Sequence, residues 1–189
     1  MKRSTIAWIA VIAVVIIIAA VLIGSYNNLV NMEESVNSSW SQVQNTLQRR
    51  ADLIPNLVAT VKGYAAHEQE IFDSVTQARE NLIAAKTAGE AGQANQELDN
   101  ALGRLLAIAE NYPDLKANQN FIALQDELAG TENRIAVARR DYNNVVQKYN
   151  AAIRRFPTNI IAGLFGFEPK EYFEAEAGAE QVPQVDFSK

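Results

Sequence analysis

Hydrophobic residues follow two different patterns along the chain. From Ile6 to Ile23 the sequence IAWIAVIAVVIIIAAVLI contains eighteen consecutive apolar residues. A helix rises 1.5 Å per residue, so this stretch covers about 27 Å, close to the roughly 30 Å hydrocarbon core of a bilayer. A single segment satisfies its backbone hydrogen bonds there only as a helix. Residues 6–23 are therefore predicted to form a transmembrane helix.

A cleaved signal peptide is the alternative for this stretch, but its apolar region usually spans about 7–15 residues. The run is longer, and an amphipathic pattern starts directly after it at Tyr26, which favours an uncleaved anchor. Lys2 and Arg3 precede the span, whereas the first basic residue after it is Arg49. The positive-inside rule then predicts that residues 1–5 are a short cytoplasmic N-terminus and that the rest of the chain lies outside the cytoplasm.

Beyond the span, apolar residues recur every three or four positions, which is the spacing of helices that bury one face. The pattern covers residues 24–157, and no alternating β-branched run indicates a strand. Its clearest part is a heptad seam of Phe121, Leu124, Leu128, Thr131, Ile135, Ala138, Tyr142, Val145, Tyr149, Ala152 and Phe156. Helices that pack at a shallow crossing angle have this spacing. The sequence predicts an all-α protein, with the transmembrane helix followed by an elongated antiparallel bundle of about four helices.

Three interruptions of the bundle are expected, near residues 50–55, 87–92 and 113–118. The second contains two glycines in the sequence TAGEAG. In the third, Tyr112 and Pro113 end one helix, and Asp114 or Asn118 can cap the next.

The first interruption, LQRRADLIPNLV at residues 47–58, combines a charge cluster with a helix breaker. Asp52 can cap a new helix that has Pro55 in its first turn, where the missing N–H has no intrahelical partner. A kinked continuous helix is the alternative, because the apolar register crosses the site. Arg49 and Arg50 are expected to pair with Asp52 at this corner, and a dedicated partner-binding site is the competing interpretation. The candidate interaction residues at the helix corners are Arg49, Arg50, Asp52, Pro55, Tyr112, Pro113 and Asp114.

The chain changes character after Pro157. Residues 158–173 are rich in apolar and aromatic side chains, and seven of them are candidate contacts with the membrane or another subunit: Ile160, Ile161, Leu164, Phe165, Phe167, Tyr172 and Phe173. The alternative is that they cap the open end of the bundle. Residues 174–189 are acidic with little apolar content, so a disordered tail is expected there.

Charge and residue types exclude several functions. The chain has 17 Lys and Arg against 22 Asp and Glu, and without Lys2 and Arg3 the balance is 15 against 22, or −7. Such a surface repels phosphate backbones, so no nucleic-acid partner is expected. Cysteine is absent, which excludes disulfides and thiolate metal sites. His67 is the one histidine, too few for a di-iron bundle site, and it is expected on the surface.

The remaining polar residues also lack a catalytic pattern. Glu132 is expected to pair with Arg134 on a helix surface. The sequence GLFGF lacks the lysine and hydroxyl of a phosphate-binding loop. No catalytic, cofactor-binding or metal-binding residue is assigned, and we expect no enzymatic activity, no cofactor and no small-molecule substrate.

Several long stretches resemble the LemA family of bacterial membrane proteins. They are YNNLV, SSWSQVQNTLQRRADLIPNLVATVKGYAAHE, TQAR, ENYPDLKANQNFIALQDELAGTENRIAVARRDYNNVVQKYN and FPTNIIAGLFGFEPKEYF, within residues 26–173. The resemblance implies an N-terminal membrane helix, an antiparallel helical bundle and a real helix break near Pro55. The family is not associated with a defined reaction, so no catalytic residue is carried over. A single-pass protein of the bacterial cytoplasmic (inner) membrane is expected.

Two non-enzymatic functions fit these observations. The first is a membrane-anchored scaffold that self-associates at the cell envelope and organises or remodels the membrane, with the lipid bilayer and further copies as partners. The second is an adaptor that recruits another envelope protein, such as a protease or chaperone, through the helix-corner residues. An enzyme would instead need a polar pocket between helices that holds a perturbed acid or base.

Overall fold

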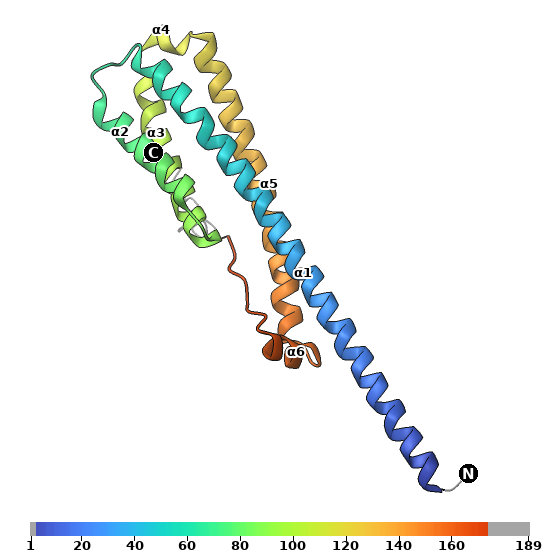
Figure 1. The fold of residues 1–189 in the computed structure, drawn as a ribbon. Helices are drawn as coiled ribbons and strands as arrows, with labels where there is room; N and C mark the ends of the chain where they lie inside the picture. Colours follow the sequence, from blue (N-terminus) through green and yellow to red (C-terminus); the bar gives the residue numbers. More distant parts are fainter. Residues whose placement is uncertain (1–2, 174–189) are drawn as a thin grey trace, which may run out of the picture. The chain divides into compact units, whose positions relative to one another are not determined.

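The computed structural model describes residues 3–173, which form six helices (Figure 1). These are α1 (Arg3–Lys62), α2 (Gln69–Ala84), α3 (Ala88–Ala109), α4 (Pro113–Lys116), α5 (Gln119–Arg154) and α6 (Thr158–Phe165). No strand occurs within residues 3–173, so the predicted all-α class is confirmed. The tail predicted at 174–189 lies outside the described residues, as do residues 1–2 of the predicted cytoplasmic N-terminus.

The chain divides into two compact units, and α1 and α5 contribute to both. The first unit comprises Met1–Ser39 and Asn144–Lys170, and the second comprises Trp40–Asn143 and Glu171–Lys189. The first unit therefore holds the apolar N-terminal part of α1 together with the end of α5 and α6. The second holds the remainder of α1 and α5 with α2, α3 and α4, and in it α2 and α3 pack against each other as a hairpin.

The apolar stretch forms the N-terminal part of α1, and its large side chains are exposed. The exposed fraction is 66% for Trp8, 62% for Ile16 and 44% for Leu22. Among the described helices, α1 is the one long and apolar enough to cross a membrane, and none of its most apolar window is buried. The core helix of a soluble protein buries at least one apolar face. An apolar helix exposed on all sides instead has the surface that lipid covers.

Beyond the span, α1 buries every seventh residue. These residues are Leu29, Val36, Val43, Arg50 and Leu57, and the corresponding buried column of α5 is Phe121, Leu128, Ile135, Tyr142 and Tyr149. A strict seven-residue repeat keeps one face of a helix directed at its partner. Phe156, predicted as the last member of the α5 seam, is instead 80% exposed, because α5 already ends at Arg154.

The break expected near residues 50–55 is absent, since α1 continues to Lys62 with Pro55 inside the helix. Proline has no N–H to donate to the carbonyl four residues earlier, which is that of Ala51. Arg79 of α2 replaces the missing donor, because its Nε donates to the Ala51 carbonyl at 2.8 Å. Ala51 is fully buried and out of reach of water. Asp52 therefore caps no helix, and its exposed carboxylate accepts a hydrogen bond from Gln48.

Arg79→Met is expected to lower the free energy of unfolding by about 1–3 kcal/mol, because it leaves the buried Ala51 carbonyl unpaired. In a Pro55→Ala background the N–H of residue 55 can bond to that carbonyl, so the same substitution should cost less. Urea unfolding of the four full-length proteins in mild detergent gives the double-mutant cycle. An equal cost of Arg79→Met in both backgrounds would show that Arg79 stabilises the bundle by another route.

The chain leaves α1 after Lys62, and residues 63–68 connect it to α2. The apolar pattern did not reveal this break, because its spacing of three and four residues continues beyond the connection to the buried residues Val75, Ala78 and Leu82. In the first turn of α2, Phe72 is 2% exposed, whereas Ile71 is only half-buried. His67 lies in this connection with its side chain exposed.

The break expected at residues 87–92 is displaced to residues 85–87. Gly89 and Gly92 fall in the first turns of α3 instead of the connection. Thr87 caps this helix, because its hydroxyl accepts from the Glu90 amide at 3.2 Å while the Glu90 carboxylate accepts from the Thr87 amide at 3.3 Å. The backbone amides of Lys86 and Thr87 hold the pKa of Glu90 below its ordinary value. This capping box starts the helix in spite of the glycines.

Candidate functional site: the buried Arg50 cluster and the apolar C-terminal segment

A buried polar cluster lies around Arg50 in the second unit. Arg50 occupies one of the seven-residue core positions of α1 and is 4% exposed. Its Nη1 donates to Asn95 Oδ1 at 2.8 Å and to Glu132 Oε2 at 2.6 Å, and its Nη2 donates to Asp99. Asn95 also donates to Asp99 Oδ2 at 3.0 Å. One guanidinium group therefore connects α1 to α3 and α5.

The Arg50 cluster combines one positive charge with two carboxylates. The side chains of Asp99 and Glu132 are 28% and 46% exposed, so both carboxylates also reach solvent. A buried ion pair adds little net stability over an apolar core, whereas removal of one partner is costly. A polar residue at a core heptad position specifies which helices pair and in which register. The geometry therefore favours a role for Arg50 in fixing the register of three helices.

Arg49 and Arg50 are neighbours in sequence but make separate contacts. The Arg49 side chain is 62% exposed, and its Nη2 lies 2.8 Å from Glu127 Oε1, which also accepts from Arg134 Nη2 at 2.8 Å. The hydrogen bond from Arg49 is the main reason that the pKa of Glu127 lies below its ordinary value. The expected pairing of both arginines with Asp52 is therefore wrong.

The expected surface pair of Glu132 and Arg134 is also wrong, since Glu132 binds Arg50 and Arg134 binds Glu127. The sequence did contain a signal for this arrangement. Arg50 interrupts the apolar register at a core position, whereas Arg49 lies one residue away from that position. A long-range partner is expected for a charge at a core position, because an unpaired buried charge is costly.

The predicted corner at residues 113–118 contains the short helix α4. Tyr112 precedes it, Pro113 is its first residue, and Asp114 is exposed in its first turn. The buried side chain of Leu115 attaches the corner to the bundle. Asn118 then caps α5, because its Oδ1 accepts from the Asn120 amide at 2.9 Å and the Phe121 amide at 3.2 Å. These contacts are those of a structural turn.

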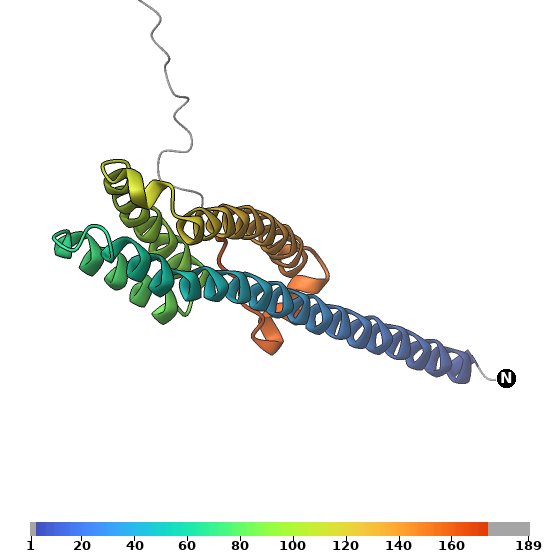
Figure 2. The same cartoon turned by 90° about the horizontal axis from the view of Figure 1, so that it is seen from above.

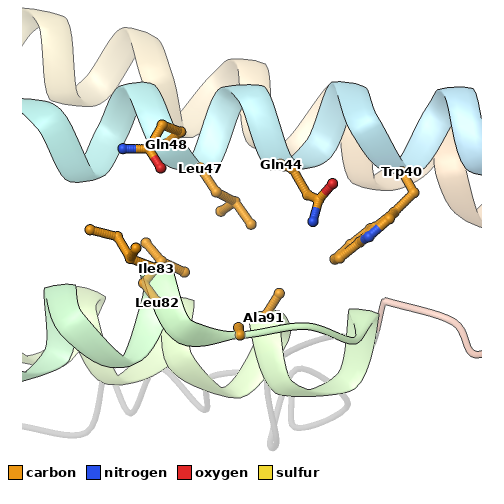
Figure 3. Close-up of a pocket in the computed structure, with 8 residues that line it drawn as sticks. Trp40, Gln44, Leu47, Gln48, Leu82, Ile83 and Ala91 are labelled. Atoms are coloured by element: carbon orange, nitrogen blue, oxygen red, sulfur yellow. The ribbon is translucent and has the colours of Figure 1, made fainter.

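A small pocket lies between α1 and the α2–α3 hairpin (Figure 3). Its labelled lining residues are Trp40, Gln44, Leu47, Gln48, Leu82, Ile83 and Ala91. The volume is about 90 Å³, whereas small-molecule sites usually measure about 300–1,000 Å³. This pocket is therefore large enough for a side chain and too small for a typical substrate.

In the first unit, the acidic residue Glu33 lies between the buried positions Leu29 and Val36 of α1. Its carboxylate accepts a hydrogen bond from Lys170 Nζ at 2.6 Å, and the same ammonium group lies 5.9 Å from the centre of the Tyr149 ring. Tyr149 is fully buried, and its hydroxyl makes no hydrogen bond among the described residues. Burial raises the pKa of Tyr149 to about 12, and the charges of Glu33 and Glu168 act in the same direction.

Two asparagines of α5 hold the segment that follows α6. Asn150 donates to the Lys170 carbonyl and accepts from the Lys170 amide, both at 2.9 Å. Asn143 makes the same pair of bonds with Phe173, also at 2.9 Å each. Asn143 and Asn150 are seven residues apart in a helix, which is a rise of about 10.5 Å, and Lys170 and Phe173 are three residues apart in an extended segment, which covers about 10 Å. The two spacings match, so both asparagines can bind the segment at once. We call these two pairs of hydrogen bonds, made by Asn143 and Asn150, the asparagine clamp. The apolar pattern could not predict the clamp, because that pattern contains only the positions of apolar residues.

Comparison with known proteins decides the family. The model of the LemA family matches residues 39–187, or 149 of the 189 residues. The chain belongs to the LemA family. Magnetosome protein MamQ 1 of Paramagnetospirillum magneticum is 31% identical to this LemA-family chain over 91% of the chain and 72% of its own length. Magnetosome protein MamQ of Magnetospirillum gryphiswaldense is also 31% identical, over 94% and 75%. Protein LemA of Metamycoplasma hominis is 27% identical, over 88% and 74%.

The single apolar N-terminal helix of this LemA-family protein and its relatives fit a membrane protein. The seven apolar residues predicted as membrane or subunit contacts divide into two groups. Ile161 and Phe173 are 1% and 2% exposed, so they belong to the core, and their predicted role as contacts is wrong. They face inward because α6 and the asparagine clamp direct them there. Ile160, Leu164, Phe165 and Tyr172 are exposed, and Phe167 is half-buried.

In this LemA-family bundle, Asn150→Ala is expected to lower the free energy of unfolding by about 1–3 kcal/mol, because it leaves the amide and carbonyl of Lys170 unpaired. Exposed Asn144 on the same helix is the control, and Asn144→Ala should change stability by less than about 0.5 kcal/mol. Hydrogen exchange of the Lys170 amide should accelerate only in the Asn150 variant. Unchanged exchange there would contradict the clamp.

Proposed function

We propose that this LemA-family protein is a non-enzymatic, membrane-anchored helical scaffold that self-associates at the cell envelope and organises or remodels the membrane. The observation that carries the proposal is the continuity of α1 from Arg3 to Lys62. One helix supplies the exposed apolar side chains of residues 7–23 and the buried core positions from Leu29 to Val61. The bundle is therefore joined to its anchor by a helix and not by a flexible linker.

The polar chemistry of the bundle supports a structural role. The two terminal nitrogens of the Arg50 guanidinium donate to Asn95, Asp99 and Glu132 on neighbouring helices, whereas its buried Nε has no partner among the described residues. Within residues 3–173, no group of three or more His, Asp or Glu side chains is placed to hold a metal ion. These features support a scaffold more than a catalyst.

A shallow groove between α1 and α5 in the second unit supports self-association. Its lining residues are Leu53, Asn56, Ala59, Thr60, Asn120, Ala123, Leu124 and Glu127. Small side chains such as Ala59 and Ala123 allow another helix to approach closely, since packing distance depends on side-chain size at the contact. Anchoring in one membrane also raises the effective concentration of neighbouring copies. A weak contact between bundles then suffices for assembly.

The mass of the full-length protein in mild detergent tests self-association. We expect a defined multiple of the 20.8 kDa chain. Ala123→Lys in the groove should shift the mass toward a single chain, because it places a charge in the contact. Ala136→Lys, at an exposed alanine of α5 outside the groove, is the matched control and should leave the mass unchanged. A strict monomer over a wide concentration range would contradict the scaffold.

An adaptor is the second candidate, and the pocket beside Trp40 favours it. Ile83 lines this pocket and is 46% exposed, so an apolar side chain of another envelope protein, such as a protease or chaperone, can insert there. A photocrosslinking residue at position 83 distinguishes the two functions in cells. Adducts with further copies of the chain support the scaffold, whereas a single foreign adduct supports the adaptor.

We further propose a single-pass location in the bacterial cytoplasmic membrane, with the N-terminus in the cytoplasm and the bundle outside. Lys2 and Arg3 support this orientation, together with the absence of any basic residue between the span and Arg49. The chain has no cysteine, so Asn144→Cys introduces a unique and exposed thiol. A membrane-impermeant maleimide should label it in intact spheroplasts. Labelling only after lysis would reverse the orientation.

A further inference from the structure

Exposed apolar side chains outside the span are concentrated at one place. Phe156, Ile160, Leu164 and Phe165 are 80%, 57%, 76% and 58% exposed. Between residues 31 and 155, all of them described, the large exposed apolar residues are Tyr64, Ile83, Ile122 and Val137. The ten residues 156–165 thus contain as many large exposed apolar side chains as the 125 residues 31–155, and we call these four side chains the patch. Isolated exposed apolar residues are ordinary, whereas a patch indicates a contact surface.

The patch lies at the end of the membrane span. The ring of Phe165 is 4.8 Å from that of Tyr26, and the ring of Phe167 is 5.8 Å from it. Tyr26 follows Ile23 by three residues, or about 4.5 Å along the helix. Both views show α6 beside α1, with the apolar stretch of α1 continuing past it (Figures 1 and 2). In a bilayer spanned by residues 6–23, Phe165 therefore lies at the depth where the hydrocarbon core gives way to lipid headgroups.

The charge around the patch suits a lipid surface. Residues 142–167 contain Lys148, Arg154 and Arg155 and no Asp or Glu, although the whole chain carries −5. Arg154 and Arg155 are exposed and directly precede Phe156. Basic residues next to an exposed apolar helix face are typical of segments that lie in the membrane interface and attract anionic headgroups.

We propose that the patch formed by Phe156, Ile160, Leu164 and Phe165 inserts into the interfacial layer of the bilayer that α1 spans, with Arg154 and Arg155 on anionic headgroups. Ile160 and Leu164 are four residues apart in α6 and share its outward face, while Ile161 and Ala162 face the core. The protein then contacts the membrane twice, through α1 and through α6. This inference rests on the membrane anchor of the proposed function and is independent of self-association.

A lipid-depth measurement on the full-length chain tests the proposal. Leu164→Cys gives one thiol for an environment-sensitive fluorophore, and the protein is placed as single copies in nanodiscs of phosphatidylcholine and phosphatidylglycerol. The emission should shift to the blue and be quenched more by lipids labelled near the headgroup than by lipids labelled deep in the chain. Val137→Cys, at an isolated exposed apolar site, is the control and should show neither effect.

The anionic contribution is tested in the same assay. Arg154→Gln combined with Arg155→Gln should reduce quenching at position 164, as should replacement of phosphatidylglycerol by phosphatidylcholine. An unquenched, solvent-like emission at position 164 would overturn the proposal. A blue shift without lipid quenching, seen only when two copies share a nanodisc, would assign the patch to a second copy and overturn it equally. If the full-length protein proves monomeric but labelled lipids still quench the fluorophore at position 164, self-association is contradicted and the lipid contact is supported.

Discussion

Replacing Arg50 by methionine is expected to lower the free energy of unfolding by about 3–5 kcal/mol, because three hydrogen bonds from a charged group are lost and each contributes about 1.5–3 kcal/mol, less where the carboxylate reaches solvent. Methionine fills similar space but leaves Asn95, Asp99 and Glu132 without the guanidinium that holds them. Domains are commonly stable by only about 5–15 kcal/mol, so the bundle loses a large share of its stability. Urea unfolding of the full-length protein in mild detergent, followed by circular dichroism, measures the difference.

The adjacent arginine gives a matched control for this prediction. Arg49→Met removes an exposed pair with Glu127 and should cost less than about 1 kcal/mol. A second variant separates lost charge pairing from lost packing. Replacing Arg50, Asp99 and Glu132 together by apolar residues should recover much of the stability, as a whole buried ion cluster can be exchanged for apolar packing. Similar losses for Arg49→Met and Arg50→Met would contradict the cluster.

Two charges in the middle of the span are expected to remove the protein from the membrane fraction. The stretch Ile6–Ile23 contains twelve Ile, Val and Leu residues, each contributing about 0.3–0.6 kcal/mol to insertion, or about 4–7 kcal/mol together. Val14→Arg with Val15→Arg costs about 2.5–3.5 kcal/mol per arginine at the helix centre, or about 5–7 kcal/mol. The penalty therefore offsets the whole driving force for insertion.

The control for the span variant places the same charges just outside the apolar stretch. Asn27→Arg with Asn28→Arg alters two exposed residues of the same helix and should leave the protein in the membrane. Carbonate extraction followed by immunoblotting of pellet and supernatant measures both variants. A Val14/Val15 variant that stays in the pellet would show that membrane attachment does not depend on the span.

The sequence predicted the features that depend on local spacing. A seven-residue repeat identified the buried column of α5 from Phe121 to Tyr149, because helical periodicity fixes which side chains share a face. The run of apolar residues also identified the apolar N-terminal part of α1. Arg50 could be recognised as an interruption of the α1 register, but its partners follow 45, 49 and 82 residues later, so the pattern could not identify them.

The predictions that proved wrong share one physical cause, which is that tertiary contacts override the local preferences of the sequence. Pro55 is a helix breaker by itself, yet Arg79, 28 residues after Ala51 in sequence, supplies the Ala51 carbonyl with the hydrogen bond that the proline ring removes. The glycines of TAGEAG are overridden by the Thr87 cap. Ile160 and Ile161 look alike in sequence, but only Ile161 faces the core of its unit. The seven-residue spacing of Asn143 and Asn150 gains meaning only once the extended segment after α6 lies along α5.

The central claim is that the apolar N-terminal helix remains attached and holds the bundle at the membrane. Mass spectrometry of the intact chain recovered from carbonate-washed membranes tests it most directly. We expect a mass that includes all of the residues from Ile6 to Ile23. A chain that begins after Ile23, or that is recovered only in the wash, would contradict it.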